Sequence, residues 1–241
     1  MRDIKVMLWQ ARVEGDPTRE EERESFAEVA GINVEQVTTV DMLTMVPTLA
    51  EVQAYDALLV GGSGDYYVSK RNLPTLDLVS ERLRELVAVG QPTFASCFGF
   101  QLLAHALGSE IIHDPEGVEV GTFDLTLTDE GAEDELFGYL PKKFTGQLGR
   151  KDRALVLPEG TIHLASSERA PFQALRVVGK PIWGTQFHPE LTKETNLARF
   201  DRYIKGYAAM MSREEIEATR SRFTDSYEAN ELVARFLRLL D

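Results

Sequence analysis

Cysteine is almost absent from this sequence, and histidine is scarce. The 241 residues contain one cysteine, Cys97, so an internal disulfide framework of the kind that holds small secreted domains together is excluded. The four histidines lie at positions 105, 113, 163 and 188, and they show neither the HExxH pattern nor the His/Cys spacing of zinc sites. We therefore expect no metal and no other cofactor.

Long apolar runs and a surplus of basic residues are also missing. No run approaches the ~18 residues of a membrane-spanning helix, and the N-terminal residues 1–4 lack a signal-peptide profile. The 26 Lys and Arg are outnumbered by 39 Asp and Glu, which gives a net charge of −13 and repels nucleic-acid phosphates. We expect a cytoplasmic protein that binds neither membranes nor nucleic acid, and its 43% hydrophobic content suffices for a full core.

The first hundred residues alternate between strand and helix patterns. Strand patterns occupy residues 4–9, 37–40, 57–60 and 92–96, and helical patterns occupy 18–31 and 76–89. This order predicts an α/β fold with a mostly parallel sheet and helices on both faces. In such sheets ligands bind beyond the carboxyl ends of the strands. The sequence from Thr18 to Glu21 predicts a capping box at the start of the first helix.

Later residues are richer in strands, and the C-terminal region is helical again. Strand patterns at 117–127, 154–157, 162–165 and 173–178 predict a partly antiparallel flank. Capping boxes at residues 212–215 and 225–228 precede apolar residues at helical spacing. We expect an α/β domain over residues 1–204 and a C-terminal helical extension over 205–241. The apolar stripe of the extension should dock on the sheet, and a partner interface is the alternative.

Cys97 lies where a short apolar strand runs directly into a helical pattern. A side chain on such a corner projects above the sheet from a strained turn, so the residues two before and two after it must be small. They are Ala95 and Gly99. The following helix aims its free N–H groups at the sulfur, which favours an anion there. The position suits a nucleophile, although a single cysteine is more often an inert buried side chain.

A second segment supplies a base for such a nucleophile. His188 and Glu190 follow the strand pattern at residues 181–187 and are separated by one proline. A thiolate nucleophile needs a proton acceptor, and the acceptor needs a third group that fixes its tautomer. Cys97, His188 and Glu190 meet this need. Taken singly, His188 equally suits a strand end, and Glu190 a helix cap.

Two motifs together resemble the class I glutamine amidotransferases. Residues 95–101 read ASCFGFQ and residues 186–190 read QFHPE, against the family's GxCxGxQ and QFHPE. The buried strand 57–60 ends in paired glycines, and VEVGT at 118–122 and LVLPEG at 155–160 are similar to the amidotransferase half of GMP synthase. The resemblance covers about the first 200 residues and implies a flavodoxin-like fold.

The resemblance also implies roles for further residues. It places the N–H groups of Gly62 and Phe98 in an oxyanion hole and makes Gly61 and Gln101 part of the substrate site. One departure affects specificity: residues 149–152 read GRKD, and Arg150 stands where the related branch has histidine. Arg150 is thus a candidate to pair with a substrate carboxylate, and a solvated charged turn is the alternative.

The implied reaction is hydrolysis of a γ-carboxamide through a thioester. His188, oriented by Glu190, accepts the thiol proton, Cys97 attacks, ammonia leaves and water resolves the thioester. In the family the ammonia passes to a synthetase, and no synthetase domain is recognisable in this sequence. A separate synthetase partner or a stand-alone γ-glutamyl peptidase both fit. A non-catalytic regulatory or interaction module is the third alternative, against which the complete set of three residues argues.

Overall fold

One large sheet forms the centre of the molecule. The computed structural model describes residues 4–204 and 212–240. Within these residues the sheet has nine strands in the order β2-β1-β3-β4-β11-β10-β9-β6-β7, namely β1 (Val6–Ala11), β2 (Val37–Asp41), β3 (Ala57–Ser63), β4 (Thr93–Ser96), β6 (Glu119–Leu127), β7 (Lys143–Arg150), β9 (Thr161–Ser166), β10 (Ala174–Val177) and β11 (Ile182–Thr185). β5 (Ile111–His113) and β8 (Asp152–Ala154) form a separate antiparallel pair.

The sheet changes from parallel to antiparallel at β11. The strands from β2 to β11 pair in parallel, and those from β11 to β7 pair antiparallel. The predicted α/β fold with a parallel sheet and an antiparallel flank is therefore confirmed. In the β4–β11 register Ser96 lies opposite Thr185, so the chain leaves these two strands side by side at the same edge.

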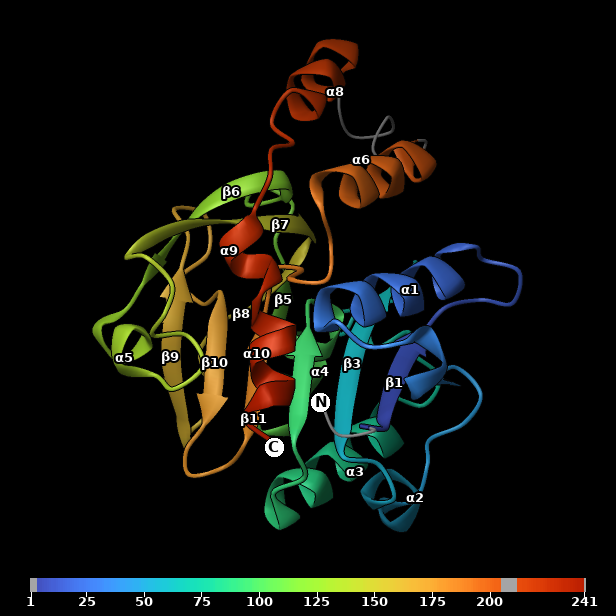
Figure 1. Cartoon of the computed structure of the whole chain (residues 1–241). Coiled ribbons are helices and arrows are strands. Elements are labelled where there is room, and N and C mark those ends of the chain that lie inside the picture. Colours follow the sequence, from blue (N-terminus) through green and yellow to red (C-terminus); the bar gives the residue numbers. More distant parts are fainter. Residues whose placement is uncertain (1–3, 205–211, 241) are drawn as a thin grey trace.

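Helices cover both faces of the parallel half (Figure 1). The described helices are α1 (Thr18–Ala30), η1 (Val34–Gln36), α2 (Leu49–Gln53), α3 (Leu76–Val89), α4 (Phe98–Ala106), α5 (Asp129–Glu133), α6 (Lys193–Arg202), α8 (Arg213–Arg220), α9 (Tyr227–Asn230) and α10 (Leu232–Arg238). α1 and α10 pack together on one face, and α3 and α4 pack together on the other.

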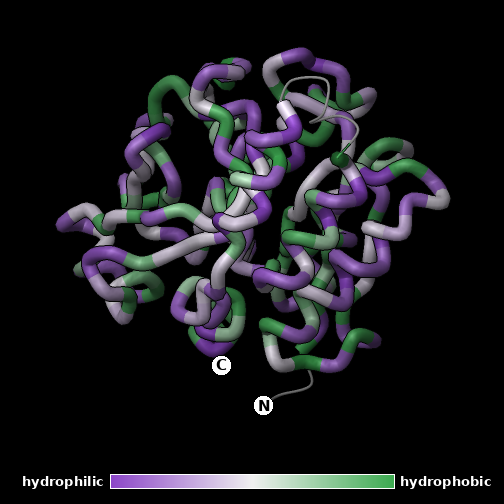
Figure 2. Tube along the Cα trace, turned by 90° about the horizontal axis from the view of Figure 1, so that it is seen from above, coloured by the Kyte–Doolittle hydropathy of each residue, from purple (hydrophilic) through white to green (hydrophobic). Residues whose placement is uncertain are grey.

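The strand period divides the core into two layers. Val6 and Leu8 of β1 belong to the cluster under α1 and α10, whereas Met7 and Trp9 belong to the cluster under α3 and α4. This is the alternation that a strand covered on both faces requires. Hydrophobic and hydrophilic residues are accordingly interspersed along the chain in both halves of the molecule (Figure 2).

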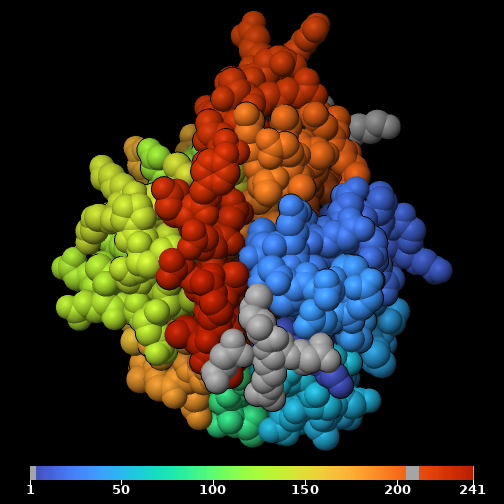
Figure 3. Space-filling view, viewed as in Figure 1, coloured from blue at the N-terminus to red at the C-terminus, as the bar shows by residue number. Residues whose placement is uncertain are grey.

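The C-terminal helix α10 lies along the sheet beside α1 (Figure 3). Its residues Leu232, Val233 and Phe236 are fully buried. The Phe236 ring lies 5.7 Å from that of Phe94 on β4 and 5.9 Å from that of Trp183 on β11, measured between centroids. The expected boundary between residues 204 and 205 stays a prediction, because residues 205–211 lie outside the described part of the chain.

The predicted helix caps agree with the structure less well than the predicted sheet does. The capping box at Ser212 is present. The one at Thr18 is not: α1 begins after Pro17, without a side-chain cap, and the Asp16 carboxylate accepts the Thr18 N–H instead. The capping box predicted at residues 225–228 is not formed either: the residue before α9 is Ser226 rather than Asp225, and its side chain makes no cap hydrogen bond. The Thr18 and Ser226 hydroxyls instead accept hydrogen bonds from Arg202 Nη1 and Gln147 Nε2, which are distant in the sequence.

Candidate active site

Cys97 forms the corner between β4 and α4. Its φ of 50° and ψ of −97° are values that residues other than glycine rarely adopt, and they give the strained turn that the sequence predicts. The Cys97 N–H donates to the Thr185 carbonyl at 2.7 Å, which ties the corner to β11. A Cβ on Gly99 would lie 2.2 Å from the Val60 carbonyl oxygen. Glycine is therefore needed for α4 to approach β3 this closely.

His188 and Glu190 stand beside this corner because β11 is the neighbour of β4. His188 Nδ1 lies 2.6 Å from Glu190 Oε1, and the other carboxylate oxygen accepts the Ser96 hydroxyl at 2.7 Å. The backbone of the segment is fixed as well, since the His188 N–H donates to the Gln147 carbonyl at 2.8 Å. With Nδ1 held by the carboxylate, Nε2 remains for the thiol.

The charge of His188 is set by its two acidic neighbours. Burial alone would lower the pKa of His188, but the charges of Cys97 and Glu190, with side-chain hydrogen bonds to both, raise the pKa to about 10. A raised pKa means that the imidazolium form persists at neutral pH. The arrangement therefore favours the imidazolium form of His188 over the neutral imidazole.

Gln101 and Gln186 connect the thiol to the floor of the site. Gln186 Nε2 lies 3.6 Å from Cys97 Sγ and can donate to it. Gln101 Nε2 in turn donates to Gln186 Oε1 at 3.1 Å and to the Asp152 carbonyl at 3.0 Å. Gln101 thus borders the cavity, but its amide group is engaged in holding Gln186. In the sequence, Gln186 stands out only as the first residue of the QFHPE motif, which does not show its contact with the thiol.

The Gly62 N–H does not point to an oxyanion position in this structure. It donates to Glu22 Oε1 at 2.9 Å, and the Glu22 carboxyl carbon lies 3.0 Å from where a Cβ on Gly61 would be. In this structure an acidic residue of α1 takes the N–H, and the expected oxyanion role of Gly62 stays a prediction. Phe98, the first residue of α4, lines the cavity next to Cys97.

Glu22 is the centre of a buried polar network. Its carboxylate accepts from Arg12 Nη2 at 3.2 Å and from Gln10 Nε2 at 2.8 Å, and Arg199 Nη1 lies 4.0 Å away. Burial would raise the pKa of Glu22, but the charges of Arg12 and Arg199 and the hydrogen bonds from Gly62 and Gln10 lower it to about 2. Glu22 is therefore ionised.

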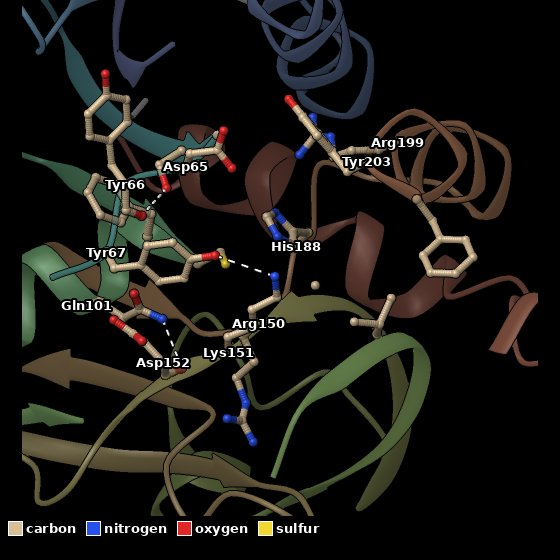
Figure 4. A pocket seen from close by; sticks show the side chains of 18 of the residues that line it. Asp65, Tyr66, Tyr67, Gln101, Arg150, Lys151, Asp152, His188, Arg199 and Tyr203 are labelled. Atoms are coloured by element: carbon tan, nitrogen blue, oxygen red, sulfur yellow. Dashed lines mark hydrogen bonds between the residues drawn. The ribbon is translucent and has the colours of Figure 1, made fainter. Parts of the chain in front are cut away.

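Arg150 does not present its guanidinium to the cavity. Arg150 Nε donates to Glu119 Oε2 at 2.7 Å and Nη2 donates to the Gly117 carbonyl at 2.9 Å. Both partners of the ion pair are fully buried, and the guanidinium points away from His188 in Figure 4. The predicted carboxylate contact and the alternative of a solvated turn are both wrong, because β6 supplies a buried acid that binds this side chain.

Lys151, the next residue, faces the cavity instead. Its Nζ lies 3.5 Å from the Tyr67 hydroxyl, and Figure 4 shows the two side chains meeting below His188. Partial burial and the charge of Lys70 lower the pKa of Lys151. Sequence reasoning named Lys151 only as part of a charged turn.

The cavity in front of Cys97 has a volume of about 330 Å³. Its walls come from the carboxyl ends of β1, β3 and β4, as expected for a parallel sheet, and from β7, the segment after β11, and α6. The charged residues that line it are Arg12, Asp65, Arg150, Lys151, Asp152, Arg199 and Arg202. The Arg150 guanidinium is turned to Glu119, but the other cationic residues still outnumber the two acids, although the chain as a whole is strongly acidic.

Metal-binding clusters and membrane-spanning helices are both absent from the described residues. No group of three or more His, Cys, Asp or Glu side chains in residues 4–204 and 212–240 is placed to hold a metal ion. None of the helices in these same residues has the length and apolarity needed to cross a membrane.

The sequence matches known proteins over most of its length. The model of the family described as glutamine amidotransferase class-I matches residues 25–202. A GMP synthase (glutamine-hydrolysing) from Aquifex aeolicus is 32% identical over 149 residues, which are 62% of this chain and 27% of that protein. The chain therefore spans about a quarter of that relative. A shorter relative, one subunit of the glutamine-hydrolysing GMP synthase from Archaeoglobus fulgidus, is 30% identical over 152 residues, 63% of this chain and 74% of that subunit.

Solved structures show the same fold. A glutamine amidotransferase from Thermotoga maritima has a TM-score of 0.71 at 18% identity and covers 98% of this chain and 97% of its own. A glutamine amido transferase from Methylobacillus flagellatus has a TM-score of 0.71 at 19% identity, with 98% and 95% covered. Because these identities are low, the likeness concerns the fold.

Proposed function

The chain is an enzyme of the class I glutamine amidotransferase family, and from this premise we propose that it hydrolyses a γ-glutamyl amide through a thioester on Cys97. One observation carries the proposal. Cys97 and the pair of His188 and Glu190 leave the adjacent ends of β4 and β11, and the thiol lies close enough to His188 to raise its pKa. Nucleophile, proton carrier and orienting group thus border one cavity.

In the proposed first step the Cys97 thiolate attacks the amide carbon. The proton that His188 carries on Nε2 passes to the departing nitrogen, the carbon–nitrogen bond breaks, and an amine or ammonia leaves. A water molecule then gives its proton to His188 and its hydroxide to the thioester carbon. The acid is released and the thiolate and imidazolium are restored. Glu190 keeps the imidazole ring oriented throughout by its contact with Nδ1.

The oxyanion of the tetrahedral intermediate needs N–H donors. We propose the Phe98 N–H at the start of α4 as one of them, because it is next to the nucleophile and belongs to the positive end of a helix. The Gly62 N–H is the proposed second donor only after it parts from Glu22 Oε1. Each donor is worth roughly 3 kcal/mol of transition-state stabilisation.

Two fates for the released nitrogen follow from different observations. Two of the relatives are named as individual subunits of a GMP synthase, which supports transfer of ammonia to a separate synthetase. The cationic lining of the cavity supports a larger acidic substrate, as in a stand-alone γ-glutamyl peptidase. The catalytic steps are the same for both.

The test is release of glutamate and ammonia from glutamine, and of glutamate and the amine from γ-glutamyl peptides. We expect Cys97→Ala to abolish turnover and His188→Ala nearly to do so. Glu190→Gln should lower kcat by about 10²- to 10⁴-fold and leave measurable activity, because Glu190 orients the base and forms no bond. Iodoacetamide should label Cys97, the only thiol, and stop turnover.

His163→Ala is the matched control, since His163 lies on β9 with its Nε2 bonded to the Ala165 carbonyl. This variant should keep full activity. Turnover that persists in Cys97→Ala would rule out the thioester mechanism.

A further inference from the structure

The cavity has a cationic group on either side of its reacting residues. Lys151 lies on one side beside Tyr67, and Arg199 lies on the other, with His188 between them (Figure 4). Arg12 belongs to the Arg199 side. A Cβ built on Gly62 would lie 3.0 Å from Arg12 Nη2 and 3.7 Å from His188 Cε1, so the guanidinium and the imidazole border the same point.

The guanidinium groups of Arg12 and Arg199 are not fully satisfied. Their side chains are 2% and 12% exposed. Among the described residues, Arg199 Nη1 and Arg12 Nε have no hydrogen-bond partner. A buried N–H without a partner costs free energy. Both arginines line the cavity, and these two unused donors are buried within its wall.

The two arginines share one close acidic partner. Glu22 is the one carboxylate within 4.0 Å of both guanidinium groups in the described part of the chain, and the charges of Asp16 and Glu190 act on Arg12 and Arg199 from further away. Burial and the charge of Arg12 lower the pKa of Arg199, which indicates that the two cations repel each other. A substrate carboxylate in the cavity would be a second close partner for both and would make charge-assisted contacts with them.

We propose that Arg12 and Arg199 form a subsite for the carboxylate on the amine half of a γ-glutamyl amino acid or peptide. This inference rests on the proposed thioester hydrolysis. In that reaction His188 protonates the departing nitrogen, so the leaving half lies next to His188, and Arg12 Nη2 borders the same point as the His188 ring. Free glutamine releases ammonia and has nothing to fill this subsite. Lys151 on the opposite side faces the glutamyl half.

A pair of substrates tests the subsite without any mutation. γ-Glutamylglycine and γ-glutamylglycinamide have the same scissile bond and nearly the same size, and they differ by one carboxylate. We expect kcat/KM for the acid to exceed that for the amide by about tenfold or more, as one charge-assisted contact provides. Raising the salt concentration should change this ratio little, because the arginines are buried.

Variants then test whether the two arginines cause the difference in kcat/KM between the acid and the amide. Arg199→Gln should bring the acid-to-amide ratio of kcat/KM close to one, and Arg12→Gln should do the same if the fold tolerates it. Lys193→Gln is the matched control, because it removes one positive charge from the start of the same helix, α6, without lining the cavity. It should keep the wild-type ratio.

The outcomes separate the subsite from the mechanism. If the wild-type enzyme hydrolyses acid and amide equally well, or if Arg199→Gln keeps the wild-type ratio, the subsite is refuted and the thioester mechanism stands. If no γ-glutamyl compound is hydrolysed, the proposed function fails and the subsite fails with it.

Discussion

At the scale of single residues, the neighbours of His188 decide its charge. Burial opposes the imidazolium, but the charges of Cys97 and Glu190 and the hydrogen bonds to them overcome that opposition and raise the pKa of His188 to about 10. Glu190 is fully buried, and within the described part of the chain His188 is the one cationic group in an ion pair with it. Removing the charge of Glu190 therefore removes the contribution of one of the two residues that raise the pKa of His188.

This balance predicts a titration. In the wild-type enzyme the His188 imidazole should stay protonated at pH 7 and lose its proton near pH 10. In Glu190→Gln the pKa should fall, because the neutral amide no longer stabilises the cation. Nuclear magnetic resonance of histidine-labelled protein measures both, and the other three histidines serve as internal references. A wild-type His188 that titrates at the ordinary value of 6.5 would contradict the imidazolium assignment.

Sequence motifs located some of these residues and not others. Cys97, His188 and Glu190 follow strands directly, so strand order and local motifs are enough to bring them to one edge of the sheet. The contact between Glu22 and Gly62 was beyond such reasoning. Glu22 is one of several acids in a row at the start of α1. Which of them turns inward depends on how the helix packs against β3.

At the scale of elements, α9 supports the segment that bears the base. Asn230 Nδ2 donates to the Pro189 carbonyl at 2.7 Å and to the Leu191 carbonyl at 2.8 Å. These two carbonyls flank Glu190. The C-terminal helices thus fix a backbone that lies far from them in the sequence.

Asn230→Ala should therefore loosen the loop between residues 188 and 191. We expect kcat to fall by about tenfold with KM less affected, and the free energy of unfolding to fall by about 1–2 kcal/mol. Asn230→Asp should behave similarly, since a carboxylate offers no donor to the carbonyls. Tyr227→Ala, on the same helix at a side chain 73% exposed, is the control and should leave both quantities unchanged. Equal kcat in Asn230→Ala and the wild type would exclude this positioning role.

Helix and strand boundaries were predictable where their signals are local. α3 lies where its apolar period predicted it, and Gly90 ends it in the left-handed conformation. β7 was missed because Gly146 and Gly149 weaken its strand pattern. The structure explains one of these glycines: a Cβ on Gly146 would come within 2.7 Å of the Leu125 side chain on β6. That packing requirement is invisible in the sequence.

At the scale of the whole molecule, α10 completes the core on one face of the sheet. Its Phe236 ring contacts Phe94 and Trp183, which lie on the two strands that lead to Cys97 and His188. A helix that contributes this much buried apolar surface belongs to the folding unit rather than to a loose tail.

Phe236→Ala should lower the free energy of unfolding by about 3–5 kcal/mol, because it leaves a cavity under α10. Urea unfolding measures the change. Leu239→Ala, at a side chain 45% exposed just after α10, should change it by less than about 0.5 kcal/mol. Similar losses in the two variants would mean that α10 does not anchor the core as described.

The pairing of β4 with β11 also determines when the enzyme becomes reactive during its synthesis. β4 ends at Ser96 and β11 begins at Ile182, so a ribosome needs on the order of ten seconds to deliver the second strand after the first. During that interval the nascent chain has a cysteine without its base, and one edge of β4 is open. Chaperones have that interval in which to shield the open strand. The thiol meets its histidine only after β11 and the segment that follows it have been translated.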